Sequence, residues 1–315
     1  MVNLTFCSSG LIETHQQMVM SALNIPLSVT AFLGNLLIIV ALQKPSSLHP
    51  PSKLLLGCLA FTDLCVGLII QPLFVIFLKS SENLRRCYYV QRIFITSGII
   101  FCGVSLMTLT AISVDRLFAL LLGLRYRQVV TLRRVRCLVA TLWLCQVSIS
   151  TIFHLNRDIF VTAICTEGVF CIITLTCCYY KIYLKLRQHH AQVQGHAHQG
   201  QLNGGGIGIN LARYKKTVSS ALWVQTLYLV SYIPFGLTVA AYAVSGPLTP
   251  SLYLTLYIQF SFVFLNSSLT RFFTVGRWGK WGKRWKMRSE DSGVRVNWAS
   301  HLFIKQTQAN VGNKL

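Results

Sequence analysis

An acidic and a basic side chain, Asp115 and Arg116, stand side by side just after the twenty uncharged residues Ile93–Ile112. The guanidinium of Arg116 presents five N–H donors in a fixed fork, which suits it to hold a carboxylate or the backbone carbonyls of another protein. A pair in this place also suits the simpler role of a boundary charge, where a membrane-spanning helix meets the headgroups. From these residues alone, a switch and a boundary charge are both open interpretations.

Polar side chains inside the apolar stretches indicate a second site, because ionisable groups at bilayer depth are costly and usually functional. Asp63 lies in the middle of the second stretch, and no Lys or Arg at bilayer depth offers itself as a partner. Asn35, Ser105 and the pair Asn266–Ser267 are polar groups at similar depth. Such oxygen ligands suit a hard cation such as sodium, and a structural hydrogen-bonded cluster is the alternative.

Two further places suggest ligand contact and helix bending. Glu167 is the only acid in the outer halves of the expected helices. We expect it to meet a polar or cationic ligand group, or else to be a satisfied structural carboxylate. Pro234 lies within the sixth apolar stretch, where a proline frees a carbonyl and bends the helix. With Tyr232 it forms the expected hinge, and Phe235 beside it is a second candidate for ligand contact.

The composition places these residues in a membrane protein. The 315 residues are 53% hydrophobic and 12% charged, whereas soluble domains carry roughly 25% charged residues. The net charge of +21 lies in the connections and the tail, as is usual for cytoplasmic segments, and no soluble domain is left that could bind nucleic acid. We therefore expect an all-α membrane protein whose surroundings are the lipid bilayer.

Seven apolar stretches are long enough to span a bilayer as helices, which predicts a seven-transmembrane helix bundle. The expected helices cover residues 19–43, 52–78, 88–118, 135–155, 159–184, 214–243 and 251–273. Residues 1–18 precede them as an N-terminal segment, and residues 274–315 follow as a tail. The His-, Gln- and Gly-rich tract 189–210 is typical of a flexible linker. No internal repeat is visible, which speaks against a transporter built from duplicated halves.

Positively charged residues predict the orientation. The connections on the side of residues 1–20 hold five Lys and Arg, and those on the opposite side hold twelve before the tail is counted. Because the cytoplasmic side is the more positive one, we expect the N-terminus outside the plasma membrane and the C-terminus in the cytoplasm. Asn3 then begins a usable glycosylation sequon. Cys7 and Cys87 are the cysteines placed where a disulfide can form.

Several short motifs follow one another in a fixed order along the chain. They are Gly34-Asn35, Leu59-Ala60 with Asp63-Leu64, Asp115-Arg116, Leu124-Arg125-Tyr126, Val130-Thr131, Trp143, Tyr180 and Pro234. Taken together, over roughly residues 30–269, they resemble the rhodopsin-like (class A) G-protein-coupled receptors. One motif departs from the family pattern, because Leu117 stands where the family has a tyrosine after the arginine.

The resemblance implies a role for each site. Asp115 would hold Arg116 at rest and release it toward a heterotrimeric G protein, with Tyr126 and Tyr180 beside this switch. Pro234 would let the sixth helix swing outward when an extracellular ligand binds. The family's sodium pocket, which holds the only cofactor implied, would consist of Asp63, Ser105, Asn266 and Ser267.

Departures limit what the resemblance implies about the ligand. Residues 97–99 hold no acid for an amine, and the seventh helix has no lysine for a Schiff base. These features speak against aminergic ligands and against an opsin. The short second outer loop, between Phe153 and Phe160, and a fifth helix without proline look like the melanocortin, cannabinoid and adenosine branch. The sequence assigns no particular ligand.

The sequence departs from the family pattern at the end of the seventh expected helix. After Leu269 the family continues with Asn-Pro-x-x-Tyr, whereas this chain has Thr-Arg-Phe-Phe-Thr-Val-Gly at Thr270–Gly276. Deleting one base from suitable codons for Asn-Pro-Ile-Phe-Tyr-Cys-Trp yields all seven of these residues. We therefore interpret the residues after 269 as out-of-frame translation, with a basic and aromatic segment on the membrane surface as the alternative.

Three functions are compatible with these observations, and none of them is enzymatic. The first is a receptor that couples an unidentified extracellular ligand to heterotrimeric G proteins. The second is a non-signalling product of a frameshifted receptor gene, and the third is a seven-span transporter or channel. An enzyme is not expected, because the cysteines and histidines lack metal-ligand spacing and no nucleophile has a base in its sequence context.

Overall fold

The computed structural model describes residues 14–43, 48–80, 83–198, 226, 229–241 and 252–268 of the chain. The chain divides into two units, Met1–Arg271 and Phe272–Leu315, and the second lies wholly outside the described residues. Within the described residues, all regular structure is helical.

The helices follow the expected order along the chain. Five helical segments are long and apolar enough to cross a membrane, and a shorter apolar helix, Leu229–Ala241, and the helix 252–268 follow them. This architecture confirms the predicted all-α membrane bundle. The labelled elements are α1 (Thr14–Gln43), α2 (Pro50–Cys65), η1 (Val66–Ile70), α3 (Gln71–Leu78), α4 (Leu84–Leu122), η2 (Gly123–Arg125), α5 (Tyr126–Val129), α6 (Leu132–Leu155) and α7 (Arg157–His198).

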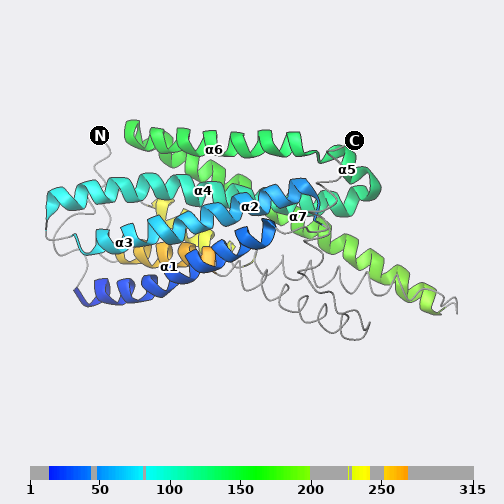
Figure 1. The fold of residues 1–315 in the computed structure, drawn as a ribbon, viewed down its shortest axis with the longest axis horizontal. Coiled ribbons are helices and arrows are strands. Elements are labelled where there is room, and N and C mark those ends of the chain that lie inside the picture. The colour runs from blue at the N-terminus through cyan, green and yellow to red at the C-terminus, as the bar shows by residue number, and fades with distance from the viewer. Residues whose placement is uncertain are drawn as a thin grey trace, which may run out of the picture. The chain divides into compact units, whose positions relative to one another are not determined.

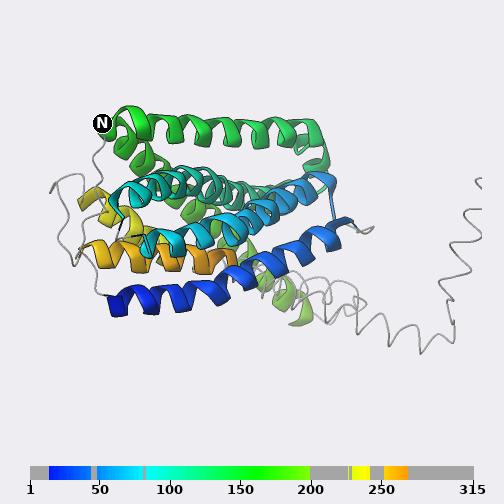
Figure 2. The same cartoon turned by 60° about the vertical axis from the view of Figure 1, so that its left-hand side comes forward.

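α4 is the central helix of the bundle, because α2, α3, α6 and α7 all contact it. Figures 1 and 2 show α1, α3 and helix 252–268, drawn in orange, running side by side. Hydrogen bonds join this last helix to α1. The amide of Asn24 donates to the Ser261 hydroxyl over 2.9 Å, and the Ser268 hydroxyl donates to the Leu27 carbonyl over 3.1 Å. Residues more than two hundred positions apart in sequence therefore pack together at this edge.

Polar side chains fix where the long helices begin. Asn83 Oδ1 accepts the backbone N–H of Arg86 over 3.1 Å at the start of α4. Asn156 Oδ1 accepts the N–H groups of Asp158 and Ile159, at 2.9 and 3.1 Å, at the start of α7. These bonds satisfy first-turn donors that have no partner within the helix. Asn156 alone joins α6 to α7, in keeping with the short outer loop expected from the sequence.

A π-helical turn, η1, interrupts the second spanning segment. The N–H of Gln71 bonds to the carbonyl of Val66, five residues back. The carbonyl of Gly67 accepts the hydroxyl of Ser28 from α1 over 2.7 Å. A Cβ on Gly67 would lie 2.7 Å from the Cβ of Ala31. Glycine is therefore required at this close approach of α1 and η1.

Aromatic side chains fill the core between α3, α4 and helix 252–268. Phe74 is fully buried, and the ring centres of Phe94 and Phe264 lie 5.4 and 5.7 Å from its own. Phe77 stacks on Phe94 at 5.9 Å with an interplanar angle of 9°. Such aromatic pairs add about 0.5–1.5 kcal/mol each beyond the area they bury. The cluster therefore holds helix 252–268 against the centre of the bundle.

α7 extends further than the sequence predicted. It continues to His198, whereas the expected helix ends at residue 184. The first ten residues of the tract 189–210 are therefore helical, and the linker prediction is wrong for them. The physical reason is local propensity, because Lys, Leu, Arg, Gln and Ala dominate the stretch after residue 184 and all favour a helix. The rest of the tract lies outside the described residues.

Candidate functional site

The C-terminal end of α4 carries a hydrogen-bonded cluster around Asp115, whose side chain is 5% exposed. The hydroxyl of Tyr126 donates to Oδ1 over 2.6 Å, and the hydroxyl of Ser52 donates to Oδ2 over 2.8 Å. The two hydroxyl oxygens lie 3.1 Å apart. Each carboxylate oxygen thus has a donor, which offsets the cost of burying the charge. Through this one side chain, α2, α4 and α5 are joined.

The environment of Tyr126 keeps its phenol protonated, so the hydroxyl remains a hydrogen-bond donor. Its ring centre lies 5.1 Å from that of His49, at the start of α2. Burial, and after it the hydrogen bond to Asp115, raises the pKa of the Tyr126 phenol above its usual value. The phenol therefore retains its proton at neutral pH, and the bond to the carboxylate persists.

Arg116 and Tyr180 are placed differently from what the resemblance implied. Within the described residues, two hydroxyl groups hold the carboxylate of Asp115, and no salt bridge joins it to Arg116. Tyr180 is 61% exposed on α7. The buried face of α7 at this level packs against α4 through Cys178 and Ile182. The guanidinium thus stays outside the Asp115 cluster, and Tyr180 lies on the outer surface of the helix.

A second cluster lies deeper in the bundle around Asp63. The hydroxyls of Ser105 and Ser267 each donate to Oδ1 of Asp63, at 2.9 Å in both cases. The amide of Asn35 donates to the backbone carbonyl of Ser267 over 3.2 Å. These residues and Asn266 are all buried. The structure therefore brings together, from α1, α2, α4 and helix 252–268, the polar groups that the sequence placed at one depth.

The donor set around Asp63 fits a hard cation. The Ser105 and Ser267 hydroxyls converge on one carboxylate oxygen, and hard cations prefer oxygen ligands of this kind. Each hydroxyl can turn its proton away and offer a lone pair instead. These three residues could therefore hold a sodium ion, with Asn266 next in the chain to Ser267.

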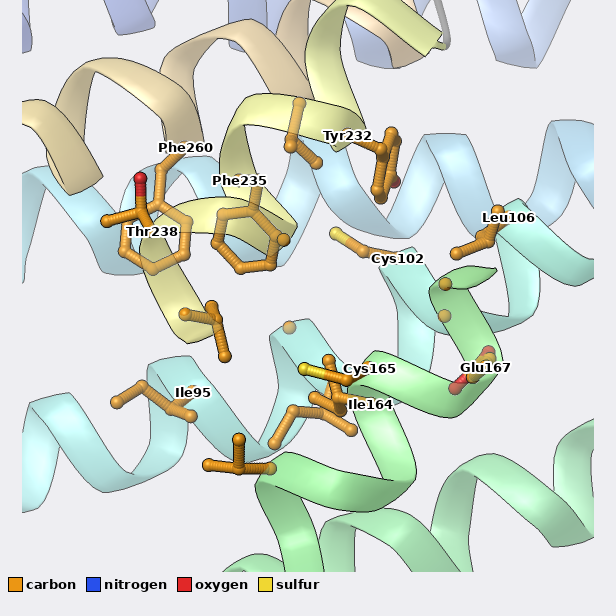
Figure 3. Close-up of a pocket in the computed structure, with 18 of the residues that line it drawn as sticks. Ile95, Cys102, Leu106, Ile164, Cys165, Glu167, Tyr232, Phe235, Thr238 and Phe260 are labelled. Carbon is orange, nitrogen blue, oxygen red and sulfur yellow. The ribbon is translucent and has the colours of Figure 1, made fainter. Parts of the chain in front are cut away.

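A cavity of about 430 Å³ lies between α4, α6, α7 and the helices 229–241 and 252–268 (Figure 3). This volume falls in the range of roughly 300–1,000 Å³ that small-molecule sites occupy. Its walls are mainly apolar, and none of the lining residues that the structure describes is Lys, Arg or His. Apolar lining residues include Ile95, Ile99, Leu106, Ile164 and Phe260. The polar ones are Cys102, Gln146, Cys165, Glu167, Tyr232 and Thr238.

Glu167 lines this cavity from α7 and accepts a hydrogen bond from α6. Gln146, which is 1% exposed, donates from Nε2 to its Oε1 over 2.5 Å. The amide of Gln146 lies against Gly103 of α4, where an added Cβ would collide with it. Figure 3 shows Glu167 near Leu106, at the end of the cavity away from Thr238. One hydrogen bond uses only part of the acceptor capacity of a carboxylate, so Glu167 can also accept from a molecule in the cavity.

Helix 229–241 presents both the predicted hinge and a predicted ligand contact. Tyr232 and Phe235, on either side of Pro234, line the cavity. The carbonyl of Pro234 accepts the hydroxyl of Thr238 over 3.0 Å. That hydroxyl in turn accepts the amide of Gln259 over 2.8 Å, which ties the helix to helix 252–268. The structure therefore places the proline directly beside the cavity wall.

Some expected site residues lie outside the described part of the chain. Cys87 is in a disulfide, and nine other described cysteines are free thiols. Its predicted partner, Cys7, is outside the described residues, so the pairing stays a prediction. The same holds for glycosylation at Asn3 and for the reading frame after Leu269.

Sequence reasoning missed several residues of these sites. Gln146 is the only amide side chain in the apolar run of α6. The criterion that identified Asp63, a polar side chain within an apolar stretch, would therefore have identified Gln146 as well. Ser52 had no comparable signal, because serine is common at helix starts. The cavity-lining glycines Gly98, Gly168 and Gly236 also carry no local signal that separates them from glycines of helix packing.

Comparison with known families indicates the class of protein to which this chain is similar. Residues 34–175 match the family model of the 7 transmembrane receptor (rhodopsin family). The match begins within α1, ends within α7, and includes both Asp63 and Asp115. Together with the five helices that are long enough to cross a membrane, it supports a multi-pass membrane protein of the G-protein-coupled receptor type.

Proposed function

We propose that this chain is a rhodopsin-like receptor of the plasma membrane that couples an extracellular ligand to heterotrimeric G proteins. The observation that carries the proposal is the Asp115 cluster, a buried carboxylate at the inner end of the central helix that two hydroxyls tie to α2 and α5. The rhodopsin-family match over residues 34–175 supports the same class of receptor.

The Asp115 cluster would act as a lock with two states. While Ser52 and Tyr126 hold the carboxylate, α2, α4 and α5 stay joined at their inner ends. When the cluster opens, the ends of α2, α4 and α5 can separate, which would give a G protein access to Arg116. The five donors of its guanidinium are suited to the backbone carbonyls of such a partner. A ligand that binds the open state more tightly shifts the population toward it.

The cavity is the proposed ligand site, with Glu167 and Phe235 as contact residues. Pro234 removes one backbone hydrogen bond from its helix, so bending is easier there than at other positions. Tyr232 and Phe235 line the cavity. A ligand that fills it therefore contacts one residue before Pro234 and one after it. An outward swing of the inner part of this helix would then open the cytoplasmic side.

The Asp63 cluster is the proposed sodium site. Asp63, Ser105 and Ser267 would hold the ion, and the bound ion would supply a positive charge beside a carboxylate that is 1% exposed. These residues come from α2, α4 and helix 252–268, so they would favour the arrangement in which the three helices stay together. This arrangement is the resting state of the proposed receptor.

A non-signalling form is the second candidate, and one observation favours it. The residues Thr270–Gly276 are those that a one-base deletion in the family's Asn-Pro-x-x-Tyr segment yields. A chain with this change would keep the cavity and the Asp63 cluster. It would lack the inner end of the seventh helix that the family has.

Nucleotide exchange without added ligand tests both candidates. The chain as written and a frame-restored chain are expressed with a panel of Gα subunits, each as wild type and as Asp115→Asn. Removing the charge weakens both hydroxyl bonds, so we expect Asp115→Asn to raise basal exchange in the frame-restored chain. A rise confined to the restored chain supports the second candidate for the chain as written. No rise in either chain, at equal surface expression, would contradict the receptor proposal.

A further inference from the structure

Four glycines line the cavity, and three of them, from three different helices, leave open space beside them. Gly98 of α4, Gly168 of α7 and Gly236 of helix 229–241 line it, and a Cβ added at any of them would meet nothing within 4 Å. Glycine is a poor helix former compared with alanine, so its presence inside a helix calls for a reason. Close packing is the reason at Gly67, where a Cβ would crowd Ala31. At the other three positions, the glycines instead leave space open.

The cavity also reaches the surface that faces lipid. Leu237 of helix 229–241 and Val169 of α7 line the cavity, yet they are 67% and 55% exposed. The cavity is partly open, so these two side chains lie at its rim. Exposed apolar side chains on spanning helices lie against acyl chains. The mouth of the cavity therefore opens sideways, between α7 and helix 229–241, toward the bilayer.

One ionisable side chain lies at the end of this apolar space. Glu167 lines the cavity and is engaged by Gln146 through one of its oxygens. An anionic group placed there would face the carboxylate with no Lys, Arg or His among the described lining residues to offset the repulsion. A group that donates a hydrogen bond would find an acceptor with capacity to spare.

We infer that the ligand is a lipophilic molecule that enters from the bilayer and carries a hydrogen-bond-donating, non-anionic polar group directed at Glu167. A hydroxyl and an amine are the two sources of such a group. Gly98, Gly168 and Gly236 provide the room for the apolar body. The signalling consequence rests on the proposed receptor function, whereas the binding itself requires no G protein.

Photolabelling of the full chain in lipid nanodiscs tests the inference with defined probes. The probes are twelve-carbon chains with a mid-chain diazirine that end in an alcohol, an ammonium or a carboxylate. Adducts on the α7 peptide that contains Glu167 are compared with adducts near Leu37, a 61% exposed lipid-facing residue of α1. We expect at least fivefold enrichment at the α7 peptide for the alcohol, the ammonium or both. The carboxylate probe should show no enrichment.

A size series at the glycines separates cavity binding from contact with bulk lipid. Gly98→Phe and Gly236→Phe fill the space and should bring labelling of the α7 peptide down to the α1 level. Gly98→Ala, which removes the glycine but little of the space, should retain most of the labelling. The alcohol should still label Glu167→Gln, which keeps a neutral acceptor, whereas the ammonium should lose its enrichment. Melting temperatures confirm that each variant is folded.

Several results would overturn the inference. These are absence of enrichment for every probe, equal enrichment of the carboxylate, or full labelling of folded Gly98→Phe and Gly236→Phe. Basal nucleotide exchange of Asp115→Asn is measured in the same preparations and involves no cavity ligand. If exchange rises and labelling fails, the ligand class is wrong and the receptor proposal stands. If labelling succeeds and basal exchange does not rise, the ligand class stands and the receptor proposal is wrong.

Discussion

The hydroxyl of Tyr126 lies 2.6 Å from Oδ1 of Asp115, so a residue eleven positions further along the chain holds the C-terminal end of α4. Tyr126 belongs to the short helix α5, which follows the turn at Gly123. That turn has a φ of 50° at Gly123, a conformation that glycine adopts without strain. The proposed lock on α4 thus depends on the path of the chain after α4 as well as on the residues within it.

Removing either hydroxyl from the Asp115 cluster should raise basal nucleotide exchange. A hydrogen bond to a charged group contributes about 1.5–3 kcal/mol, and about 1.4 kcal/mol is a tenfold change in a two-state equilibrium. Allowing for compensation by the remaining donor, we expect Tyr126→Phe and Ser52→Ala each to raise basal exchange severalfold in the frame-restored chain. Tyr183→Phe, on the exposed face of α7, is the control. Equal basal exchange in all three variants would contradict the lock.

Sodium should suppress basal exchange through Asp63. We expect wild-type exchange to be lower in sodium chloride than in choline chloride, because the ion would hold three helices together at the carboxylate. Asp63→Asn keeps the shape but removes the charge, so its exchange should be the same in both salts. Asp158→Asn, an acid on the exposed start of α7, should retain the sodium effect. A sodium effect that survives in Asp63→Asn would place the ion elsewhere.

Gly67→Ala should destabilise the bundle. The new Cβ would lie 2.7 Å from the Cβ of Ala31 and from the backbone nitrogen of Phe32, so α1 must move away from η1. Overpacking of this kind typically costs about 1–3 kcal/mol, and a lower melting temperature in nanodiscs is the expected result. Gly57→Ala is the matched control, because its Cβ would meet Leu42 Cδ1 at an ordinary 4.0 Å. Equal melting temperatures for the two variants would show that α1 packs differently there.

Gln146 and Glu167 should behave as a coupled pair in thermal unfolding. Gln146→Leu leaves the half-buried carboxylate of Glu167 without this amide donor, which costs about 1–3 kcal/mol. The double variant Gln146→Leu/Glu167→Leu removes both partners and should lose less stability than the sum of the single changes. Ser148→Ala, on the exposed face of α6, serves as control. If the stability losses of the two single variants add up to that of the double variant, the interaction between Gln146 and Glu167 contributes nothing to stability.

The all-α bundle was predictable, because seven apolar runs and few charges leave no other architecture for a membrane chain. The Asp63 cluster was predictable for a related reason. A carboxylate in such a run requires polar partners, and Ser105 and Ser267 were among the few available. The structure placed both hydroxyls at 2.9 Å from it. The Asp63 cluster was predictable because polar groups are scarce at bilayer depth.

The partner of Asp115 was not predictable in the same way. The neighbouring Arg116 is the obvious candidate from charge alone, yet Ser52 and Tyr126 hold the carboxylate. Near the membrane surface, polar residues are plentiful, and only the packing of α2 and α5 against α4 selects among them. The cavity escaped prediction because it depends on space between helices, which a list of residues does not contain.

The single-residue junction at Asn156 has a mechanical consequence. With one residue between them, the adjoining ends of α6 and α7 cannot separate, and they translate as one hairpin. Helix 229–241, joined to helix 252–268 through Thr238 and Gln259, belongs to the opposite wall of the cavity. Widening of the cavity between α7 and helix 229–241 therefore requires motion of one of these two walls relative to the other. An engineered cross-link between α7 and helix 229–241 would restrain that motion, whereas a cross-link between α6 and α7 would leave it free.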